Sequence, residues 1–255
     1  MNILTGIDVP HGSPGGSIQL LEDLYLGPAP LIPADVFMLD PGNGAVAATR
    51  SGPILLPVKG KALSGAAFWS YVERLTAAVK DACAALDFSS IHLQHLAFGA
   101  TPALQRAFPD HPKIALVHGT DVLFATEDQT QAEVLRTAVE AATAIVVPTG
   151  AMADRLRQMV PLTPDRIVRI PWGVPDSLLA RPPVRTPRLP GVLRVLYAGR
   201  LTPEKATSQV IAAVADLDGI ELGVAAPAAE FARLAERADL SRARHLGWLS
   251  RQQLW

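Results

Sequence analysis

The sequence predicts an α/β protein, in which a Rossmann-like unit with a doubly wound parallel sheet is followed by the beginning of a second Rossmann-like unit. Three observations predict this class. Short apolar runs alternate with helical patterns, as in βα units around a parallel sheet. The 255 residues suffice for one large domain or two small ones. A proline-rich stretch divides the chain into residues 1–170, a Pro- and Arg-rich linker at 171–192, and residues 193–255.

The expected strands are short runs of aliphatic and β-branched residues. They are residues 2–7, 35–39, 90–93, 113–117, 144–147, 167–170, 193–198 and 220–225. Helices are expected at 66–86, 129–142, 151–160, 205–215 and 228–238, and in a short segment around Leu20, Leu21 and Leu24. The clearest is 66–86, where one face is apolar: Phe68, Tyr71, Val72, Leu75, Val79, Cys83 and Leu86.

The composition excludes several classes of protein. A hydrophobic fraction of 49% with 18% charged residues excludes a disordered chain and a disulfide-rich miniprotein. The net charge of −1 provides no global field for nucleic acid or an anionic membrane, so any anion site must be local. Because there is no apolar run near 18 residues and no basic leader, we expect a soluble, cytoplasmic protein without a transmembrane segment.

The single cysteine, Cys83, cannot form an internal disulfide, which agrees with a reducing compartment. It lies on the apolar face of the expected helix 66–86, and no histidine is near it in sequence. We therefore expect a buried thiol and not a nucleophile.

The expected linker removes backbone donors at Pro171, Pro175, Pro182, Pro183, Pro187 and Pro190. Arg181, Arg185 and Arg188 are expected to keep it in water, in preference to binding phosphate. After the linker the chain has 63 residues, short of the roughly 100 that a doubly wound domain needs. We expect the second unit to be incomplete.

A glycine-bearing loop, residues 11–17, follows the first expected strand and leads into a short helix. Gly15 and Gly16 permit close approach of a ligand, and the helix N-terminus offers free N–H groups to an anion. The loop is neither a dinucleotide fingerprint nor a Walker loop. An ordinary strand-to-helix turn explains it equally well.

His118 and Gly119 follow the strand 113–117, where open α/β sheets bind ligands. We expect His118 to lie near Gly15 and Gly16 at the carboxyl edge of one sheet. His92 and His95 are three residues apart in extended chain, which disfavours a shared metal ion. They are expected to be structural.

A third segment, residues 196–205, ends a strand in Gly199-Arg200 and places Lys205 at a helix start. Two cations together with helix N–H groups suit an anion such as a diphosphate leaving group. Solvated Arg200 and Lys205 side chains are the alternative.

Taken together, five segments resemble glycosyltransferase family 4: Gly15-Gly16, VHGTD (117–121), IVVPTGAMADRL (145–156), RIVRIPWGV (166–174) and LYAGRLTPEK (196–205). The resemblance implies the GT-B fold, with two Rossmann-like domains. It also implies sugar transfer from a nucleotide donor with retention and without a metal or other cofactor.

The resemblance implies roles for five residues. Gly15 and Gly16 would lie beside the donor diphosphate, and His118 would contact the transferred sugar. Arg200 and Lys205 would neutralise the donor phosphates.

The chain departs from the family pattern at three places. Ala206 stands where glycine usually follows the lysine, and Trp172 and Pro175 replace residues that are commonly Asn and Asp. The Glu-x7-Glu segment that holds the donor is expected beyond Trp255, so the 255-residue chain alone is expected to be inactive.

The expected partners are a nucleotide-sugar donor and a small-molecule or lipid-linked glycan acceptor, with no nucleic acid. A non-catalytic sugar- or nucleotide-binding protein, a truncated relative of the family, is the alternative. An NAD-dependent oxidoreductase is disfavoured by the missing fingerprint. Asp216-Leu217-Asp218 has the D-x-D pattern of a metal site, but it precedes Gly219, which favours a turn.

Overall fold

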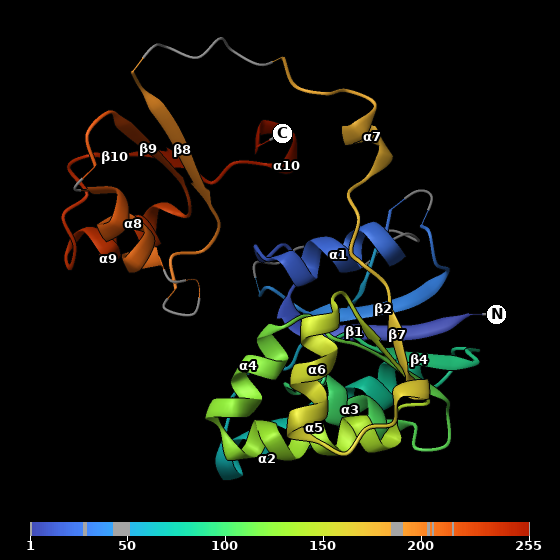
Figure 1. Cartoon of the computed structure of the whole chain (residues 1–255). Coiled ribbons are helices and arrows are strands. Elements are labelled where there is room, and N and C mark those ends of the chain that lie inside the picture. The colour runs from blue at the N-terminus through green and yellow to red at the C-terminus, as the bar shows by residue number, and fades with distance from the viewer. Residues whose placement is uncertain are drawn as a thin grey trace. The chain divides into compact units, whose positions relative to one another are not determined.

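The computed structural model describes residues 2–27, 30–42, 52–184, 191–202, 205, 207–215 and 217–254 (Figure 1). The chain divides into two compact units, Met1–Gly173 and Val174–Trp255. The expected linker at 171–192 spans this division. Of its residues, Arg185, Pro187, Arg188 and Pro190 lie outside the described part of the chain.

The first unit is built on a seven-stranded sheet in the order β3-β2-β1-β4-β5-β6-β7. All neighbouring strands are parallel, which confirms the predicted parallel sheet. The strands are β1 (Ile3–Pro10), β2 (Ala34–Leu39), β3 (Ile54–Leu56), β4 (Ser90–Leu93), β5 (Lys113–Leu116), β6 (Ala144–Val147) and β7 (Ile167–Arg169).

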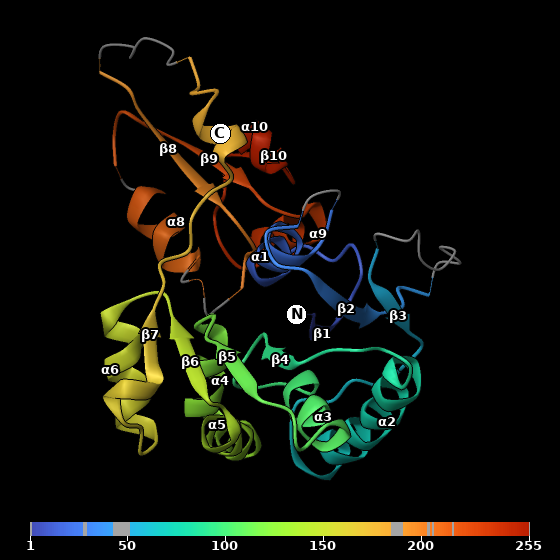
Figure 2. The ribbon, with the colours of Figure 1, turned by 90° about the vertical axis from the view of Figure 1, so that its right-hand side faces the viewer.

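Helices cover both faces of this sheet (Figure 2). They are α1 (Gly16–Tyr25), α2 (Gly65–Cys83), α3 (Ala100–Ala107), α4 (Thr120–Glu127), α5 (Gln129–Ala141) and α6 (Gly150–Met159). The apolar side of α1 packs with Ile7, Val36 and Met38 on one face. Leu4 and Phe37, from the same two strands, point into the core formed with α2, α3, α5 and α6. The alternation along β1 and β2 makes the sheet doubly wound.

Gly6 lies in the middle of the central strand β1, where glycine ordinarily weakens a sheet. Its partner in register on β2 is Phe37, which is fully buried. A Cβ atom at position 6 would lie 2.5 Å from the Phe37 ring. The glycine is therefore required by close packing of this ring against the strand.

Several elements of the first unit were not predicted. The three-residue strand β3 is too short to show alternation, and α3 contains Pro102, which interrupts a helical pattern. Pro102 is tolerated because it lies in the first turn, where a backbone N–H has no intrahelical acceptor. Strand β1 also continues to Pro10, three residues beyond the expected end, and α2 ends at Cys83 and not at residue 86.

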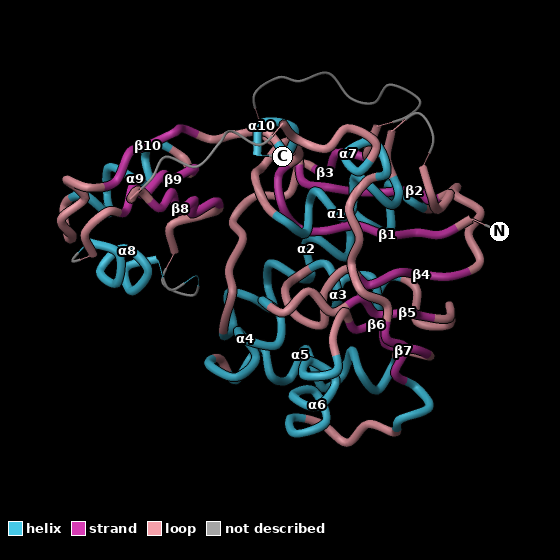
Figure 3. The backbone as a smooth tube through the Cα atoms, turned by 45° about the horizontal axis from the view of Figure 1, so that its top comes forward, coloured by secondary structure: helices cyan, strands magenta, loops and turns pink. Residues whose placement is uncertain are grey.

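The second unit contains a three-stranded parallel sheet in the order β10-β9-β8 (Figure 3). Its strands are β8 (Leu193–Ala198), β9 (Ile220–Ala225) and β10 (Ala243–Gly247). Its helices are α7 (Asp176–Leu179), α8 (Thr207–Ala215), α9 (Ala228–Ala235) and α10 (Arg251–Leu254). Apolar residues of α8 and α9 pack on one face of the sheet, around Ile211, Leu222 and Val224.

Four expectations for the second unit need correction. The helix expected from Lys205 begins at Thr207, and the helix expected to reach residue 238 ends at Ala235. Strand β10 was missed because its sequence, ARHLG, mixes charged and apolar residues. Helix α7, which was not predicted, lies within the segment expected to be a linker, and it buries Leu178.

Cys83 is 1% exposed, and burial raises the pKa of its thiol to about 11. This confirms the predicted buried, unreactive thiol. Among the described residues, no helix is long and apolar enough to cross a membrane.

We expect Gly6→Ala to destabilise the protein by about 1–3 kcal/mol, because the added methyl group would overlap the Phe37 ring. Urea unfolding followed by circular dichroism measures the change. Gly150→Ala is the matched control, because the Cβ added at the start of α6 would meet only Arg169 Nη1, at 4.0 Å. Equal stability of Gly6→Ala and wild type would contradict the packing described here.

Candidate active site

The first cluster of candidate residues lies where β1, β4 and β5 end and their loops begin. Gly15 precedes α1 and Gly16 opens it. An added Cβ at Gly16 would meet nothing within 4 Å, and at Gly15 it would meet only Ile18, at 3.8 Å. Packing within the protein does not require glycine at either position. The open space on this loop leaves room for a ligand to approach the backbone.

The loop is connected to His118 through His95. Ser17, the second residue of α1, forms a 3.1 Å hydrogen bond between its Oγ and His95 Nε2. The ring centroids of His95 and His118 are 4.4 Å apart. The structure thus brings the Gly15-Gly16 segment and His118 together at one edge of the sheet, as predicted.

The His118 ring lies near two other rings. Its centroid is 4.4 Å from that of the His95 ring and 5.9 Å from that of the Trp172 ring. His118 Nε2 is buried and has no hydrogen-bond partner among the described residues. Because a buried polar atom without a partner is costly, this nitrogen is a candidate contact for a bound ligand.

Asp121, which is fully buried, fixes the loop that carries His118. Its Oδ1 accepts hydrogen bonds from the backbone N–H groups of Gly119 (2.7 Å) and Val122 (3.0 Å). Its Oδ2 accepts from the N–H of Leu96 (2.9 Å) and, more weakly, of His118 (3.4 Å). One carboxylate therefore joins the loop after β5 to the loop after β4, which carries His95.

A second buried carboxylate, Asp8 near the end of β1, holds the other side of the loop after β4. Its Oδ2 accepts from Gly99 N at 3.1 Å and from the Tyr71 hydroxyl at 3.3 Å. The same oxygen forms an ion pair with Lys61 Nζ at 3.1 Å. Phe98, beside Gly99, has a φ of 67°, a strained conformation for a residue with a side chain.

Both histidines at this edge are neutral. Burial lowers the pKa of His118 to about 3; protonation of the neighbouring His95 would lower it further, and Asp121 opposes the shift. Burial, aided by the charge of Lys61, lowers the pKa of His95 to about 3. The site therefore presents uncharged imidazoles at neutral pH.

The second unit carries the predicted cations. Arg200 follows β8, and its Nε lies 3.0 Å from Glu230 Oε1 in α9. Glu230 Oε2 also accepts from Leu201 N at 2.7 Å. Lys205 is exposed, and its backbone N–H donates to Thr202 O at 3.0 Å. Pro203, Glu204 and Ala206, which belong to the same motif, lie outside the described residues.

A sequence model of glycosyltransferase family 4 matches residues 34–178, more than half of the chain. The chain belongs to glycosyltransferase family 4. No curated protein sequence matches it.

Solved structures of low identity share its fold. Sucrose-phosphate synthase from Thermosynechococcus elongatus superimposes with a TM-score of 0.72 at 17% identity, covering 99% of this chain and 72% of the synthase. Anabaena HepE in complex with UDP and glucose gives 0.61 at 16% identity, covering 98% and 70%. UDP-GlcNAc 2-epimerase from Neisseria meningitidis bound to UDP-GlcNAc gives 0.60 at 9% identity, covering 100% and 74%. The family 4 chain has an α/β, GT-B-like fold.

The position of His95 in this family 4 glycosyltransferase was not foreseen. His92 and His95 were both expected to be structural, and His92 does pair with Tyr25, at 2.8 Å between Nδ1 and the hydroxyl oxygen. His95, however, lies between Ser17 and His118. The available signal was its place two residues beyond the end of β4, at the same sheet edge as His118.

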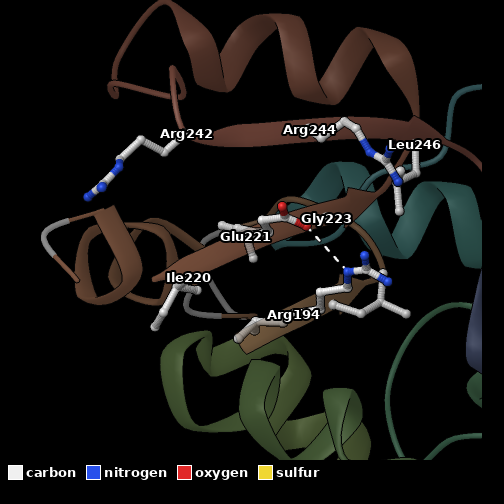
Figure 4. Close-up of a pocket in the computed structure, with 10 residues that line it drawn as sticks. Arg194, Ile220, Glu221, Gly223, Arg242, Arg244 and Leu246 are labelled. Atoms are coloured by element: carbon white, nitrogen blue, oxygen red, sulfur yellow. Dashed lines mark ion pairs between the residues drawn. The ribbon is translucent and has the colours of Figure 1, made fainter. Parts of the chain in front are cut away.

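The cavity in Figure 4 is separate from the predicted cations. It measures about 740 Å³ and lies on the three strands of the second unit. Arg194, Glu221 and Arg244 contribute to its lining, and Arg194 Nε pairs with Glu221 Oε2 at 3.4 Å (Figure 4). A smaller cavity of about 250 Å³ lies beside the loop after β8, lined in part by Leu201 and Glu230.

The D-x-D pattern is only partly described, because Asp216 lies outside the described residues. Asp218 lies in a turn, fully exposed, and forms an ion pair with Arg242 at 3.4 Å. Within the described part of the chain, no group of three His, Cys, Asp or Glu side chains is arranged to hold a metal ion.

We expect the free energy of unfolding to fall as the pH is lowered from about 6.5 to about 4. Unfolded histidines titrate near 6.5, whereas burial lowers the pKa of His92 to about 4 and those of His95 and His118 to about 3. The unfolded state therefore binds more protons in this window, and each histidine contributes a loss of about 1 kcal/mol per pH unit.

Urea unfolding at a series of pH values measures this slope. His95→Phe should reduce this slope, because it removes one buried imidazole. Lys61 and His118, the titratable groups that face His95, are still present in this variant. A His95→Phe slope equal to that of wild type would contradict a neutral, buried His95.

Asp121→Asn is expected to destabilise the protein by about 1–3 kcal/mol. The amide retains one acceptor oxygen but directs its NH2 group at backbone N–H groups that now donate to the carboxylate. Thermal and urea unfolding measure the loss. Glu127→Gln, at the exposed end of the same helix, is the control. Matching losses for the two variants would show that Asp121 does not join the loops.

Proposed function

We propose that the protein transfers a sugar from a nucleoside-diphosphate-sugar donor to an acceptor, with retention of anomeric configuration and without a metal ion. The observation that carries the proposal is the buried, unpartnered Nε2 of His118 at the carboxyl edge of the first sheet. It lies on a family 4 framework, and the adjoining Gly15-Gly16 loop has open space beside its backbone.

A nucleotide-sugar donor is supported by the chemistry of the neighbours. HepE was solved with UDP-glucose, and the Neisseria epimerase with UDP-GlcNAc. In this chain, Arg200 and Lys205 are cations near the start of α8. The backbone N–H groups at a helix start also attract anions. A diphosphate is the chemical group that fits this combination.

The role proposed for Arg200 and Lys205 is electrostatic. As the bond between sugar and diphosphate breaks, negative charge grows on the leaving oxygen. Fixed cations lower the barrier because they interact more strongly with the diphosphate in the transition state than in the ground state. The two side chains would supply the positive charge that a divalent ion supplies in other enzymes.

His118 would contact the transferred sugar as a neutral hydrogen-bonding group. Glycosyl transfer builds positive charge on the sugar ring, as in glycoside hydrolysis. An imidazolium would repel that charge. Because burial lowers its pKa to about 3, His118 instead offers Nε2 to a hydroxyl group without opposing the transition state.

The proposed acceptor is a small molecule or a lipid-linked glycan. A hydroxyl group of the acceptor would attack on the same face from which the diphosphate leaves, which gives retention. The Gly15-Gly16 loop would lie beside the donor diphosphate and the reacting centre, where the absence of two Cβ atoms permits close approach.

Transfer assays on the full-length enzyme, with a panel of nucleotide sugars and acceptors, test this proposal. Arg200→Ala and Lys205→Ala should each lower kcat/KM by about 100-fold or more, because each removes one charge-stabilising group. Arg194→Ala is the matched control, since it removes an arginine from another ion pair of the same unit. Turnover should persist in EDTA, and NMR of the product should show the donor's anomeric configuration.

Each alternative has its own outcome. Binding of a nucleotide sugar without turnover by any donor and acceptor would favour a non-catalytic binding protein. Loss of turnover on chelation would contradict metal independence, and an inverted product would contradict retention. Equal kcat/KM for Arg200→Ala and wild type at subsaturating donor would remove Arg200 from the site.

A further inference from the structure

Glu230 makes two contacts with the loop that carries Arg200. It lies in the first turns of α9, and its side chain is only 11% exposed. One carboxylate oxygen pairs with Arg200 Nε at 3.0 Å, and the other accepts from Leu201 N at 2.7 Å. The Glu230 carboxylate therefore binds the guanidinium of Arg200 and the backbone N–H of Leu201.

The backbone of this loop has other attachments besides Glu230. Gly199 N donates to Ala225 O at 3.0 Å, and the Tyr197 hydroxyl donates to Arg200 O at 2.9 Å. The same hydroxyl lies 2.8 Å from Thr207 Oγ1, at the start of α8. Because these bonds already fix the chain at Arg200, the contact with Nε acts mainly on the side chain.

The geometry of the pair leaves the binding edge of Arg200 accessible. The ion pair uses Nε, and no hydrogen bond joins either Nη group to another described residue. The Arg200 side chain is 52% exposed, so the ion pair leaves about half of it open to solvent. Two Nη groups form the planar fork that matches two oxygens of a phosphate.

The pair differs from an ordinary surface ion pair in the burial of its acid. Arg194 and Glu221 are both more than half exposed and 3.4 Å apart, a pair expected to contribute little. Glu230 is nearly buried and anchored by Leu201 N, so its position is fixed before Arg200 binds to it. A fixed carboxylate restrains the long arginine side chain, which otherwise loses rotamer freedom when a ligand binds.

We propose that Glu230 is a positioning residue that aims the guanidinium of Arg200 at the donor diphosphate. This inference rests on the proposed function, because it assumes that Arg200 binds a diphosphate. Helix α9 would thus contribute to donor binding through Glu230, whose carboxylate acts only on Arg200 and does not touch the donor.

Two variants separate position from charge. Glu230→Asp keeps the charge but withdraws the carboxylate by one methylene group, and Glu230→Gln keeps the length but removes the charge. Positioning predicts that both weaken the binding of UDP, by about tenfold. Simple repulsion between Glu230 and the phosphates predicts that Glu230→Gln binds UDP more tightly and that Glu230→Asp changes little.

UDP affinity is measured by calorimetry on the full chain, with Glu221→Gln as the control that breaks the exposed pair. Proton–nitrogen NMR of arginine side chains gives an independent readout. The Arg200 Nε–H signal should be protected from solvent exchange in wild type and lose this protection in both Glu230 variants. Melting temperatures identify any variant that is merely unfolded.

A double-mutant cycle excludes a purely structural role. In the Arg200→Ala background, Glu230→Gln should have no further effect on UDP affinity, because the side chain that it positions is absent. Additive effects would overturn the proposal, as would unchanged or tighter binding by Glu230→Gln while wild type binds UDP. If wild type binds no UDP, the other nucleoside diphosphates replace it as the probe; if none of them binds, the proposed function fails, and this inference fails with it.

Discussion

The buried carboxylate of Asp121 is the constraint on which the geometry of the first site depends. It accepts from Leu96 on one loop and from Gly119 and Val122 on the next, so two loops that follow different strands share one anchor. It also occupies the N-terminal end of α4, where free N–H groups would otherwise attract an anion. The end of α4 is therefore used to build the site and is not available to bind phosphate.

The polar groups of the two units differ in burial and in charge. In the first unit the carboxyl groups of Asp8 and Asp121 are buried and accept from backbone N–H groups, while His95 and His118 remain neutral. In the second unit the arginine and lysine of the motif remain exposed. In the proposed function, the neutral groups would contact the sugar and the cations would contact the diphosphate.

The sequence predicted the features that depend on local patterns of apolar residues. Strands 90–93, 144–147, 193–198 and 220–225 were predicted to the residue, and Gly16 and His118 were identified because loops at the carboxyl ends of parallel strands meet at one edge. His95 and Glu230 were missed for a different reason. Their importance comes from contacts with residues 78 and 30 positions away, and no local pattern encodes such a partner. Strand β10 was missed because its charged residues hide the alternation.

Trp172 shows how a departure from the family pattern changes the site. The resemblance places asparagine commonly at this position, and an amide beside His118 could donate to or accept from the imidazole. Trp172 instead presents a ring to His118, at 5.9 Å between centroids. Ring packing restrains the imidazole without occupying its nitrogen, and His118 Nε2 has no partner within the described chain. Trp172 therefore contacts the His118 ring through its own ring and leaves Nε2 without a hydrogen-bond partner among the described residues.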